Sequence, residues 1–528
     1  MTDPVAALSA LLAVGMFEEW RVPLTVAYVV LLLLIGIYGL HRYWLVATFK
    51  KHRKDVPRPK SRFDELPLVT VQIPMFNEGM VARRIIDAAC ELDYPLDKLQ
   101  VQVIDDSTDD TLDVSREAVE YWQAHGVYIE LIHRTDRTGF KAGALANAMP
   151  KVKGDYIAMF DADFVPPPSF LRRTIHHFTD PGIGMVQTRW DHLNRNDSTL
   201  TRSQAIFLDG HFVIEHTARQ RSQRWFNFSG TGGVWRLQAI HDAGGWEHDT
   251  LTEDMDLSYR AQLAGWRFVH LPRITCPAEL PPEMNAFKSQ QHRWTKGQMQ
   301  TAKKILPAVL RSAAPLKVKI EAFFHLTSPL VYLYINLFVL LFYPAIAANV
   351  KGAGSWAGVV FGLSMFGMGA MSASVFYLFS QRLLKRGFWV TLLQIPMMMS
   401  VGIGIALSNA IACLEALFGH QSDFVRTPKY NVNSTPRPSK SSTEPKTTMG
   451  LGRIVPIPSL KKWVIVLELL MGSYMVWCAI AAAGNPYTVV SLPFIVLFGM
   501  GYFYVGLSSL WIHVRTWLES RSLAAQAT

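Results

Sequence analysis

The segment Tyr156-Ile157-Ala158-Met159-Phe160-Asp161-Ala162-Asp163 joins a short β-rich run to two carboxylates that are one residue apart. Similar runs lie on both sides of it, and amphipathic stretches with helical spacing separate them. The candidate strands are Val69 to Ile73, Val101 to Ile104, Tyr128 to Ile132, Tyr156 to Phe160 and Met185 to Thr188. The candidate helices are Val81 to Glu91, Leu112 to Ala124 and Ala142 to Met149. This alternation predicts an α/β sandwich with a largely parallel sheet.

Carboxylates follow two of these candidate strands. Asp105-Asp106 come after the second strand, and Asp161 and Asp163 come after the fourth. Ligands of parallel α/β sheets bind beyond the carboxyl ends of the strands. Two carboxylates one residue apart can reach one hard cation and leave its other positions to phosphate oxygens and water. A solvated acidic turn has the same pattern, and Ser107-Thr108-Asp109 is also compatible with a plain helix cap.

Two further motifs lie downstream of the acidic clusters. Thr252-Glu253-Asp254 precedes a helical pattern, where the helix dipole favours acids in any case. Gln290, Arg293 and Trp294 are three and four positions apart, so they share one face of a helix. Arginine can bind a diphosphate through two hydrogen bonds, and an indole ring can stack on a sugar. The alternative for this pair is a core tryptophan beside a surface arginine.

In this order, the four motifs resemble the D, DxD, TED and QxxRW series of the processive family 2 glycosyltransferases. Their flanking residues are similar to those of the plant cellulose-synthase-like A and C proteins, which build mannan and glucan backbones. The resemblance runs from about Val69 to Gly297 and covers the catalytic half of the chain. It implies a GT-A (Rossmann-like) domain that uses Mg²⁺ or Mn²⁺ and transfers a hexose from a nucleotide sugar with inversion to a β-linked polysaccharide.

The resemblance also implies roles for individual residues. Asp254 is the expected general base, and Asp161 and Asp163 are the expected metal ligands. The residues expected to hold the donor are Pro74, Phe76, Asn77, Glu78, Asp105, Asp106, Lys141, Asp161, Gln290 and Arg293. The residues expected to contact the acceptor are Ser229, Gly230, Thr231, Glu253 and Trp294. The plant proteins usually carry Asn where Ser229 stands, which leaves the acceptor open, and Lys141 is also compatible with an exposed lysine at a helix start.

A last motif, Phe424-Val425-Arg426-Thr427-Pro428-Lys429, resembles the FxVTxK gating loop with which cellulose-type synthases cover the bound donor. Arg426 replaces Val, and Tyr430 replaces Gly. The resemblance implies that Thr427 and Lys429 contact the donor pyrophosphate and that this loop is cytosolic. A basic, proline-containing loop at a membrane interface would have a similar sequence by chance.

Half of the residues are apolar, and the net charge is +10. The basic residues cluster beside apolar segments, as the positive-inside rule expects, and they are not interleaved with aromatic residues as in nucleic-acid-binding surfaces. We therefore predict membrane lipids, and no nucleic acid, as partners. The four cysteines have no metal-ligand spacing and are predicted to be reduced apolar fillers: Cys90, Cys276, Cys413 and Cys478.

The apolar segments predict an integral multi-pass membrane protein of the cell or inner membrane with a cytosolic catalytic domain. Residues 1–46 contain an interfacial helix, Val5 to Phe17, and a first span, and residues 47–297 form the catalytic domain. An interfacial amphipathic helix follows over 298–319, and a transmembrane hairpin over 320–380. Residues 381–462 hold the gating-loop segment and Phe388 to Leu417, which we expect to be re-entrant or interfacial because one crossing would place the basic run after it outside. A second hairpin and a tail occupy 463–528.

The predicted function is polymerisation of a β-glucan or β-mannan from UDP-glucose or GDP-mannose, with export of the growing glycan through the membrane half. An accessory export subunit is compatible with this function. A non-processive transferase to a lipid acceptor, of the ceramide glucosyltransferase or polyprenyl-phosphate sugar transferase type, shares the acidic motifs and is the main alternative. A transporter with a catalytically dead domain would have no chemical need for the acids, which argues against that class.

Overall fold

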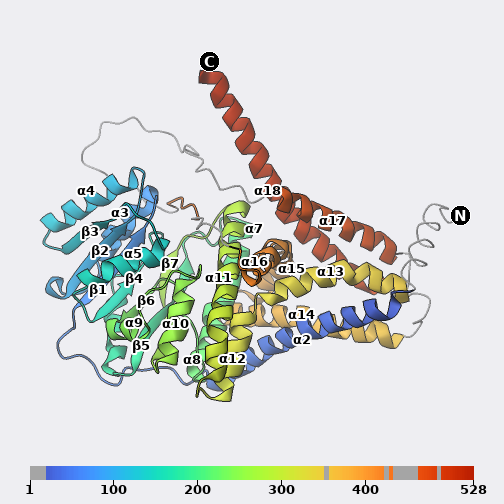
Figure 1. The fold of residues 1–528 in the computed structure, drawn as a ribbon, viewed down its shortest axis with the longest axis horizontal. Coiled ribbons are helices and arrows are strands. Elements are labelled where there is room, and N and C mark those ends of the chain that lie inside the picture. The colour runs from blue at the N-terminus through green and yellow to red at the C-terminus, as the bar shows by residue number, and fades with distance from the viewer. Residues whose placement is uncertain (1–18, 350–355, 421–426, 432–461, 484–488, 528) are drawn as a thin grey trace. The chain divides into compact units, whose positions relative to one another are not determined.

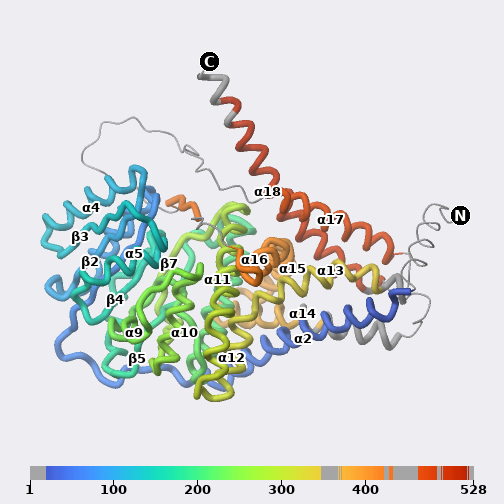
Figure 2. Tube along the Cα trace, viewed as in Figure 1, coloured from blue at the N-terminus to red at the C-terminus, as the bar shows by residue number. Residues whose placement is uncertain are grey.

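The computed structural model describes residues 19–349, 356–420, 427–431, 462–483 and 489–527, which Figure 1 draws as a coloured ribbon. Figure 2 follows the chain as a tube from blue at the N-terminus to red at the C-terminus. The predicted interfacial helix Val5 to Phe17 and the first part of the predicted gating loop lie outside the described residues. The chain divides into two compact units. We call Thr48–Phe323, Ser422–Ser459 and Thr516–Thr528 the sheet unit, and Met1–Ala47, Phe324–Gln421 and Leu460–Arg515 the helical unit.

The sheet unit contains one seven-stranded mixed sheet with the strand order β3-β2-β1-β4-β6-β5-β7 (Figure 1). Its strands are β1 (Val69–Met75), β2 (Leu99–Asp105), β3 (Tyr128–His133), β4 (Tyr156–Met159), β5 (Ile183–His192), β6 (Gly233–Arg236) and β7 (Arg267–Ala278). Strands β1 to β4 pair in parallel, and β6 is antiparallel to both of its neighbours, β4 and β5. The carboxyl ends of β1, β2 and β4 therefore open onto one edge of the sheet.

Helices cover both faces of this sheet, because alternate residues of each strand point to opposite sides. Val71 of β1 and Ala158 of β4 pack in one buried cluster with α3 (Gly79–Cys90), α4 (Thr111–Ala124) and α6 (Phe170–Thr174). Ile157 and Met159 of β4 pack in a second cluster with α5 (Phe140–Ala148), α9 (Leu237–Asp242) and α10 (Glu253–Leu263). The result is an α/β sandwich of three layers, which confirms the predicted fold class.

The remaining elements of the sheet unit are short, apart from one long helix. They are α7 (Thr199–Asp209), the π-helix η4 (Gly210–His216), α8 (Thr217–Arg221) and the 3₁₀ turns η1 (Leu96–Lys98), η2 (Met149–Lys151) and η3 (Ile175–Thr179). The long helix α11 (Met284–Arg311) contains Pro307 and runs across the predicted boundary at 297. It is followed by α12 (Leu316–Thr327).

The helical unit contains α2 (Arg21–His52), α13 (Leu330–Asn349), α14 (Trp356–Leu383), α15 (Phe388–Gly404), α16 (Ala406–Leu417), α17 (Lys462–Ala483), η5 (Val489–Ser491) and α18 (Leu492–Ala527). In the described part of the chain, four helices are long and apolar enough to cross a membrane: Arg21–His52, Phe388–Leu417, Lys462–Ala483 and Leu492–Glu519. These helices indicate a membrane protein. The predicted re-entrant or interfacial path of Phe388–Leu417 stays a prediction.

The predicted span from Ile320 to Ala345 is a bent pair of helices. Leu316–Thr327 and Leu330–Ala345 meet at an angle of 57°. Pro329 lies between them, and proline has no backbone N–H to donate and clashes with the preceding turn, so the helix breaks there. Within the helical unit, the Tyr502 hydroxyl donates to Asn336 Oδ1 at 3.0 Å in a buried cluster that includes Leu32 and Phe338.

Candidate active site

The loops that follow β1 and β2 are tied together by Asn77. Its backbone N–H donates to Ser107 Oγ at 2.7 Å, and its Oδ1 accepts from the Thr108 N–H at 2.8 Å. Asn77 has a φ of +53°, which Asn tolerates better than most residues. Of its predicted partners in the donor site, Pro74 is buried within β1, Phe76 is half-buried, and Glu78 precedes the first turn of α3.

The two neighbouring acids after β2 have different surroundings. Asp105 is fully buried, and its two carboxylate oxygens accept from the Ser107 N–H at 2.8 Å and from the Ser115 hydroxyl at 2.6 Å. Asp106 forms a bidentate pair with Arg134, with Nε–Oδ1 at 2.9 Å and Nη2–Oδ2 at 2.8 Å. Asp105 therefore orders the loop, whereas Asp106 ties it to the segment that leads into Lys141.

Lys141, Asp161 and Asp254 converge around the turn at Gly230. Lys141 Nζ donates to Asp161 Oδ1 at 2.6 Å and to the Gly230 carbonyl at 3.0 Å. Gly230 has a φ of +80°, and a Cβ on it would lie 3.2 Å from Asp254 Oδ2 and 3.6 Å from Lys141 Nζ. The left-handed backbone conformation favours glycine here, and a Cβ would also press against the Asp254 carboxylate.

Burial and charge shift the pKa values of these groups. Burial raises the pKa of Asp254 to about 7, and the neighbouring Glu253 carboxylate adds to the shift, while Lys141 opposes it. Burial alone would lower the pKa of Lys141, but Asp161, Glu253 and Asp254 together raise it. A carboxyl with a pKa near neutrality can accept a proton efficiently at physiological pH, as a general base requires.

Asp163 is buried and pairs with Lys429. Lys429 Nζ lies 2.6 Å from Asp163 Oδ2, and burial raises the pKa of Asp163 although Lys429 opposes the shift. The next residue, Tyr430, is also held in place: its backbone N–H donates to Glu279 Oε2 at 3.0 Å. Arg84 on α3 closes the network by donating to Glu279 Oε1 at 2.8 Å and to Asn431 Oδ1 at 3.1 Å.

Thr427, the other predicted donor contact in this segment, is almost completely buried. Its hydroxyl has no hydrogen-bond partner among the described residues. A buried hydroxyl without a partner is costly, so an acceptor such as a phosphate oxygen would satisfy it. Thr427 and Lys429 thus belong to the sheet unit together with Asp163, and their contact with a donor stays a prediction.

Helix α11 brings Arg293 to the acids. Burial lowers the pKa of the Arg293 guanidinium, and the charges that oppose this shift come from Glu253, Asp161, Asp254 and Glu78. Gln290 lies half-buried one turn earlier on the same helix. Four of the predicted residues are therefore electrostatic neighbours of the predicted diphosphate-binding arginine.

Trp294 belongs to an aromatic group on the predicted acceptor side. Its ring centroid lies 6.3 Å from that of Trp190, which in turn contacts Phe164 and Phe212 at 5.2 Å each. Trp190 Nε1 donates to the Thr231 carbonyl at 3.3 Å, so the group is anchored to the glycine-rich turn. Aromatic faces of this kind suit the apolar faces of sugar rings.

Two predicted acceptor residues, Ser229 and Thr231, are held by internal hydrogen bonds. The Thr231 hydroxyl is buried and accepts from the Asp161 N–H at 2.8 Å, so Thr231 fixes the backbone that carries the acid. The Ser229 N–H donates to Gln187 Oε1 at 2.9 Å, and its hydroxyl lies 3.2 Å from His216 Nε2. Ser229 is half-buried, so a contact between its hydroxyl and an acceptor stays a prediction.

Several residues of the site were not predicted from the sequence. Arg134 holds Asp106, and Arg137 places its guanidinium carbon 3.3 Å from the centre of the Phe76 ring. Both arginines follow the third predicted strand. Ligands of α/β sheets bind beyond the carboxyl ends of the strands, so this position could have identified both arginines as site residues. Arg84, Glu279 and Trp190 carry no such signal.

The residues after β4 fit a divalent cation. Asp161 and Asp163 each already hold one ammonium group, on Lys141 and Lys429, and the two carboxylates interact electrostatically. Mg²⁺ and Mn²⁺ prefer oxygen ligands such as carboxylates, and these two carboxylates already attract cations. The two lysines could then turn to the phosphate oxygens of a bound nucleotide.

We expect the Glu279→Gln variant to loosen the segment that carries Lys429. Glu279 accepts two hydrogen bonds with its two oxygens, and bonds to a charged group stabilise by about 1.5 to 3 kcal/mol each. Tryptic cleavage after Lys429, followed by mass spectrometry, should accelerate on the order of tenfold. Glu117→Gln, at an exposed acid on α4, is the control, and equal cleavage rates in the two variants would contradict the docking role of Glu279.

Comparison with known proteins adds three findings: a family match, two relatives by sequence, and a likeness of fold. Residues 67–297 match the family described as "Glycosyltransferase like family 2". A probable glucomannan 4-beta-mannosyltransferase 6 of Oryza sativa subsp. japonica is 45% identical over 249 residues, which cover 46% of this chain and 43% of the relative. The glucomannan 4-beta-mannosyltransferase 2 of Arabidopsis thaliana is 43% identical over 251 residues, which cover 47% of each chain. The matched region thus spans about half the length of the curated relatives.

The third finding concerns the fold. Mannosyltransferase PcManGT from Pyrobaculum calidifontis, solved in complex with GDP-Man and Mn²⁺, is 22% identical with a TM-score of 0.52. The match covers 75% of this chain and all of that chain. With the family match, this likeness shows that the sheet unit has the GT-A fold of glycosyltransferases, as the sequence predicts.

Proposed function

We propose that the protein is an inverting membrane glycosyltransferase that builds a β-linked mannan from GDP-mannose, because residues 67–297 match the glycosyltransferase-like family 2. One observation carries the proposal. Lys141, Asp161 and Asp254 converge at the Gly230 turn, in a region 43 to 45% identical to plant glucomannan mannosyltransferases. The names of those relatives support the proposed mannosyl donor, and the convergent charged groups support the proposed chemistry.

In the proposed reaction, Asp161 and Asp163 would hold Mg²⁺ or Mn²⁺, which when bound neutralises charge on the diphosphate leaving group. Lys141 and Arg293 supply further positive charge on the same side, because both interact with Asp161. Asp106 and the Phe76 ring line the end of the sheet at which the nucleoside is expected. In this proposal, Lys141 and Arg293 neutralise the charge of the diphosphate, and Asp106 and Phe76 contact the nucleoside.

Asp254 is proposed as the base that takes the proton from the acceptor hydroxyl, so that the oxygen attacks the sugar carbon opposite the leaving diphosphate. Its position at the start of α10 places it beside Lys141 and near Arg293. Glu253 and Trp294 are proposed to contact the acceptor sugar. Proton transfer to a positioned base typically contributes a factor on the order of 10² to 10⁴ in rate.

We expect kcat/KM to depend on pH through Asp254. Its pKa is raised to about 7, so the base is protonated and inactive at lower pH and becomes competent as the pH rises through 7. About one pH unit below this value, roughly a tenth of the molecules would carry the active carboxylate. A pH profile of kcat/KM measures this limb. A flat profile between pH 5 and 7 would contradict the assignment of the base.

The membrane half is proposed to place the sheet unit in the cytosol and to lead the growing glycan across the bilayer. Support comes from the candidate membrane helices and from the basic residues Lys50, Lys51 and His52 in the last turn of α2. A cysteine introduced at Asn431 should react with an impermeant thiol reagent in inverted vesicles and not in intact cells. The reverse labelling pattern would exclude this orientation.

The donor and the product can be tested together. Purified protein would be incubated with radiolabelled GDP-mannose, UDP-glucose or UDP-N-acetylglucosamine, with Mn²⁺ or Mg²⁺, and any polymer digested with linkage-specific hydrolases. We expect a labelled polymer from GDP-mannose that a β-mannanase degrades. Polymer from UDP-glucose alone would exclude the mannan, and label confined to organic-solvent extracts would favour a lipid acceptor.

A further inference from the structure

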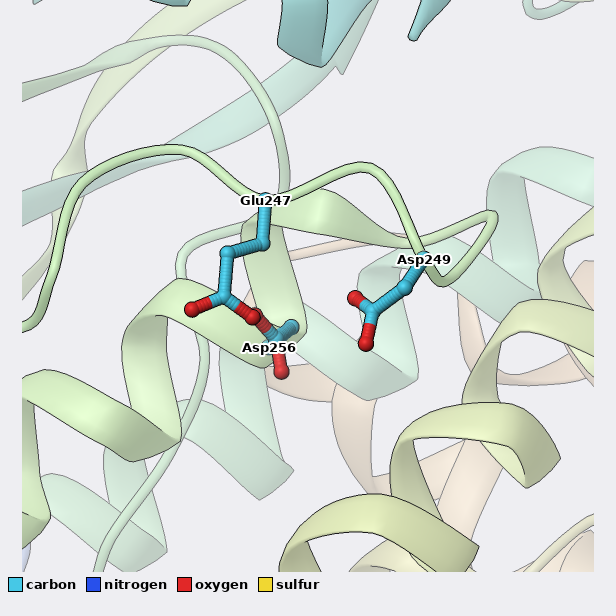
Figure 3. Close-up of side chains that lie close together, drawn as sticks. All are labelled: Glu247, Asp249 and Asp256. Atoms are coloured by element: carbon cyan, nitrogen blue, oxygen red, sulfur yellow. The ribbon is translucent and has the colours of Figure 1, made fainter.

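Three acidic side chains near the start of α10 surround a lysine from α11. One carboxylate oxygen from each of Glu247, Asp249 and Asp256 lies within 4.8 Å of the other two (Figure 3). Lys304 Nζ lies 2.5 Å from Glu247 Oε2, 2.7 Å from Asp249 Oδ1 and 3.0 Å from Asp256 Oδ1. The ammonium group thus occupies the position in which such a cluster would otherwise hold a metal ion.

The charges of this cluster depend on one another. Asp256 is fully buried, and its second oxygen pairs with Arg260 at 2.6 Å. Burial alone would lower the pKa of Lys304, but its hydrogen bonds to the three carboxylates raise it, so the lysine is charged. Removing one partner from a buried ion pair leaves an uncompensated charge, which is strongly destabilising. This argument applies to Asp256, whose charge is compensated by Lys304 and Arg260, whereas the side chains of Glu247 and Asp249 are 42% and 57% exposed.

Other residues on the same face of α11 contact the chain just before α10. Leu251 N–H donates to Gln300 Oε1 at 3.0 Å, and the Thr252 and Thr301 hydroxyls are 3.1 Å apart. At Gly297 the two segments meet so closely that a Cβ would lie 2.8 Å from the Thr252 nitrogen. These α11 positions repeat every three or four residues up to Lys304, which is the spacing of one helix face.

This face joins two parts of the active site. Arg293 lies four positions before Gly297 on α11, and Asp254 lies in the first turn of α10, which begins directly after Thr252. The contacts from Gly297 to Lys304 therefore set how far α10 extends toward Arg293 and Lys141. Catalytic geometry is sensitive to such placement, because a displacement of about 1 Å can cost a factor of 10² in rate.

We propose that Lys304 is a positioning residue for glycosyl transfer. Its ammonium, held by three carboxylates, fastens the start of α10 to α11 and so keeps Asp254 beside Lys141 and Arg293. The proposal rests on the proposed function for its catalytic consequence. Its structural part, the fastening of α10 by Lys304, does not depend on the identity of the sugar.

The first test is kinetic. Lys304→Met, which keeps the aliphatic stem and removes the charge, is expected to lower kcat on the order of 10- to 100-fold per folded molecule. The donor KM and the affinity for GDP with Mn²⁺ should stay within about twofold, because the residues that hold the nucleotide lie elsewhere. Lys303→Met, at the exposed neighbouring lysine, is the control, and Lys304→Arg should recover most of the rate.

The second test is structural and needs no sugar. Hydrogen exchange in the peptides that cover residues 247–256 should accelerate in Lys304→Met and not in Lys303→Met. Accelerated exchange with an unchanged kcat would overturn the positioning role, and so would a parallel loss of kcat and GDP affinity. Unchanged exchange would exclude Lys304 as the fastener of α10.

A third variant covers the case in which Lys304→Met does not fold. Thr301→Val removes the hydroxyl contact to Thr252 at nearly constant volume, and the same split between kcat and nucleotide affinity is expected with a smaller effect. If wild-type protein transfers no sugar while exchange responds to Lys304 as expected, the proposed function fails and the fastening role stands.

Discussion

The Asp254→Asn variant is expected to bind donor normally and to transfer almost no sugar. The amide keeps nearly the shape of the carboxyl and cannot accept the proton of the acceptor hydroxyl at neutral pH. Because a general base contributes on the order of 10² to 10⁴ in rate, kcat should fall by a factor in that range. Polymer yield from labelled donor gives kcat, and calorimetry with GDP and Mn²⁺ gives donor-site affinity.

The control for this variant is Asp113→Asn, which removes a carboxylate that is 79% exposed on α4. Its kcat should equal that of the wild type. The residual activity of Asp254→Asn should also lose the rise of kcat/KM with pH near 7, because the titrating group is gone. Wild-type polymer yield in Asp254→Asn would exclude Asp254 as the base.

The Asp161→Ala and Asp163→Ala variants are expected to lose the metal dependence of nucleotide binding. Each substitution removes one of two expected metal ligands, and the gain in GDP affinity on adding Mn²⁺ should fall by about two orders of magnitude. Loss of Asp163 also leaves the Lys429 ammonium without its partner at 2.6 Å. The freed lysine can bind the diphosphate directly. The affinity for GDP in EDTA should therefore fall less than the affinity for GDP in Mn²⁺.

Calorimetry with GDP in Mn²⁺ and in EDTA separates these two effects. Asp97→Ala, at an exposed acid in η1, is the control and should behave as the wild type in both conditions. An unchanged ratio of the two affinities in both site variants would place the metal elsewhere. A change in one variant alone would identify the single carboxylate that binds it.

Where hydrophobic periodicity is regular, the sequence predicts the sheet well. Four of the predicted strands lie within β1, β2, β3 and β5, and the fifth, Tyr156 to Phe160, extends one residue beyond β4. The acids after them meet because parallel strands end at one edge. β6 and β7 were not predicted. β6 has four residues, and β7 contains Pro272 and Pro277 and pairs with β5 through shifts in register, so neither shows a clean alternation.

The sequence predicts the charged residues of the site better than it predicts which of them form ion pairs. Motif spacing points to Asp163 and Lys429, but their pairing joins segments far apart in the chain. Arg84 and Glu279 are 195 positions apart, and Lys304 and Glu247 are 57 positions apart. Ion pairs of this kind depend on tertiary packing, which leaves no local pattern of polarity or propensity to read.

The antiparallel strand β6 has a consequence for how the protein is made. As the chain emerges from the ribosome, β1, β2 and β3 can pair early, because a single α-helix joins each of these strands to the next. β4 pairs with the more distant β1. β6 must then insert between β4 and β5. The Asp161 backbone N–H gains its hydrogen-bond partner, the Thr231 hydroxyl, only when the chain is 70 residues longer. We therefore expect a nascent chain released before residue 236 to contain the expected metal ligands Asp161 and Asp163 and still to bind no metal–nucleotide. Nucleotide binding would then begin only after the sheet is completed during synthesis.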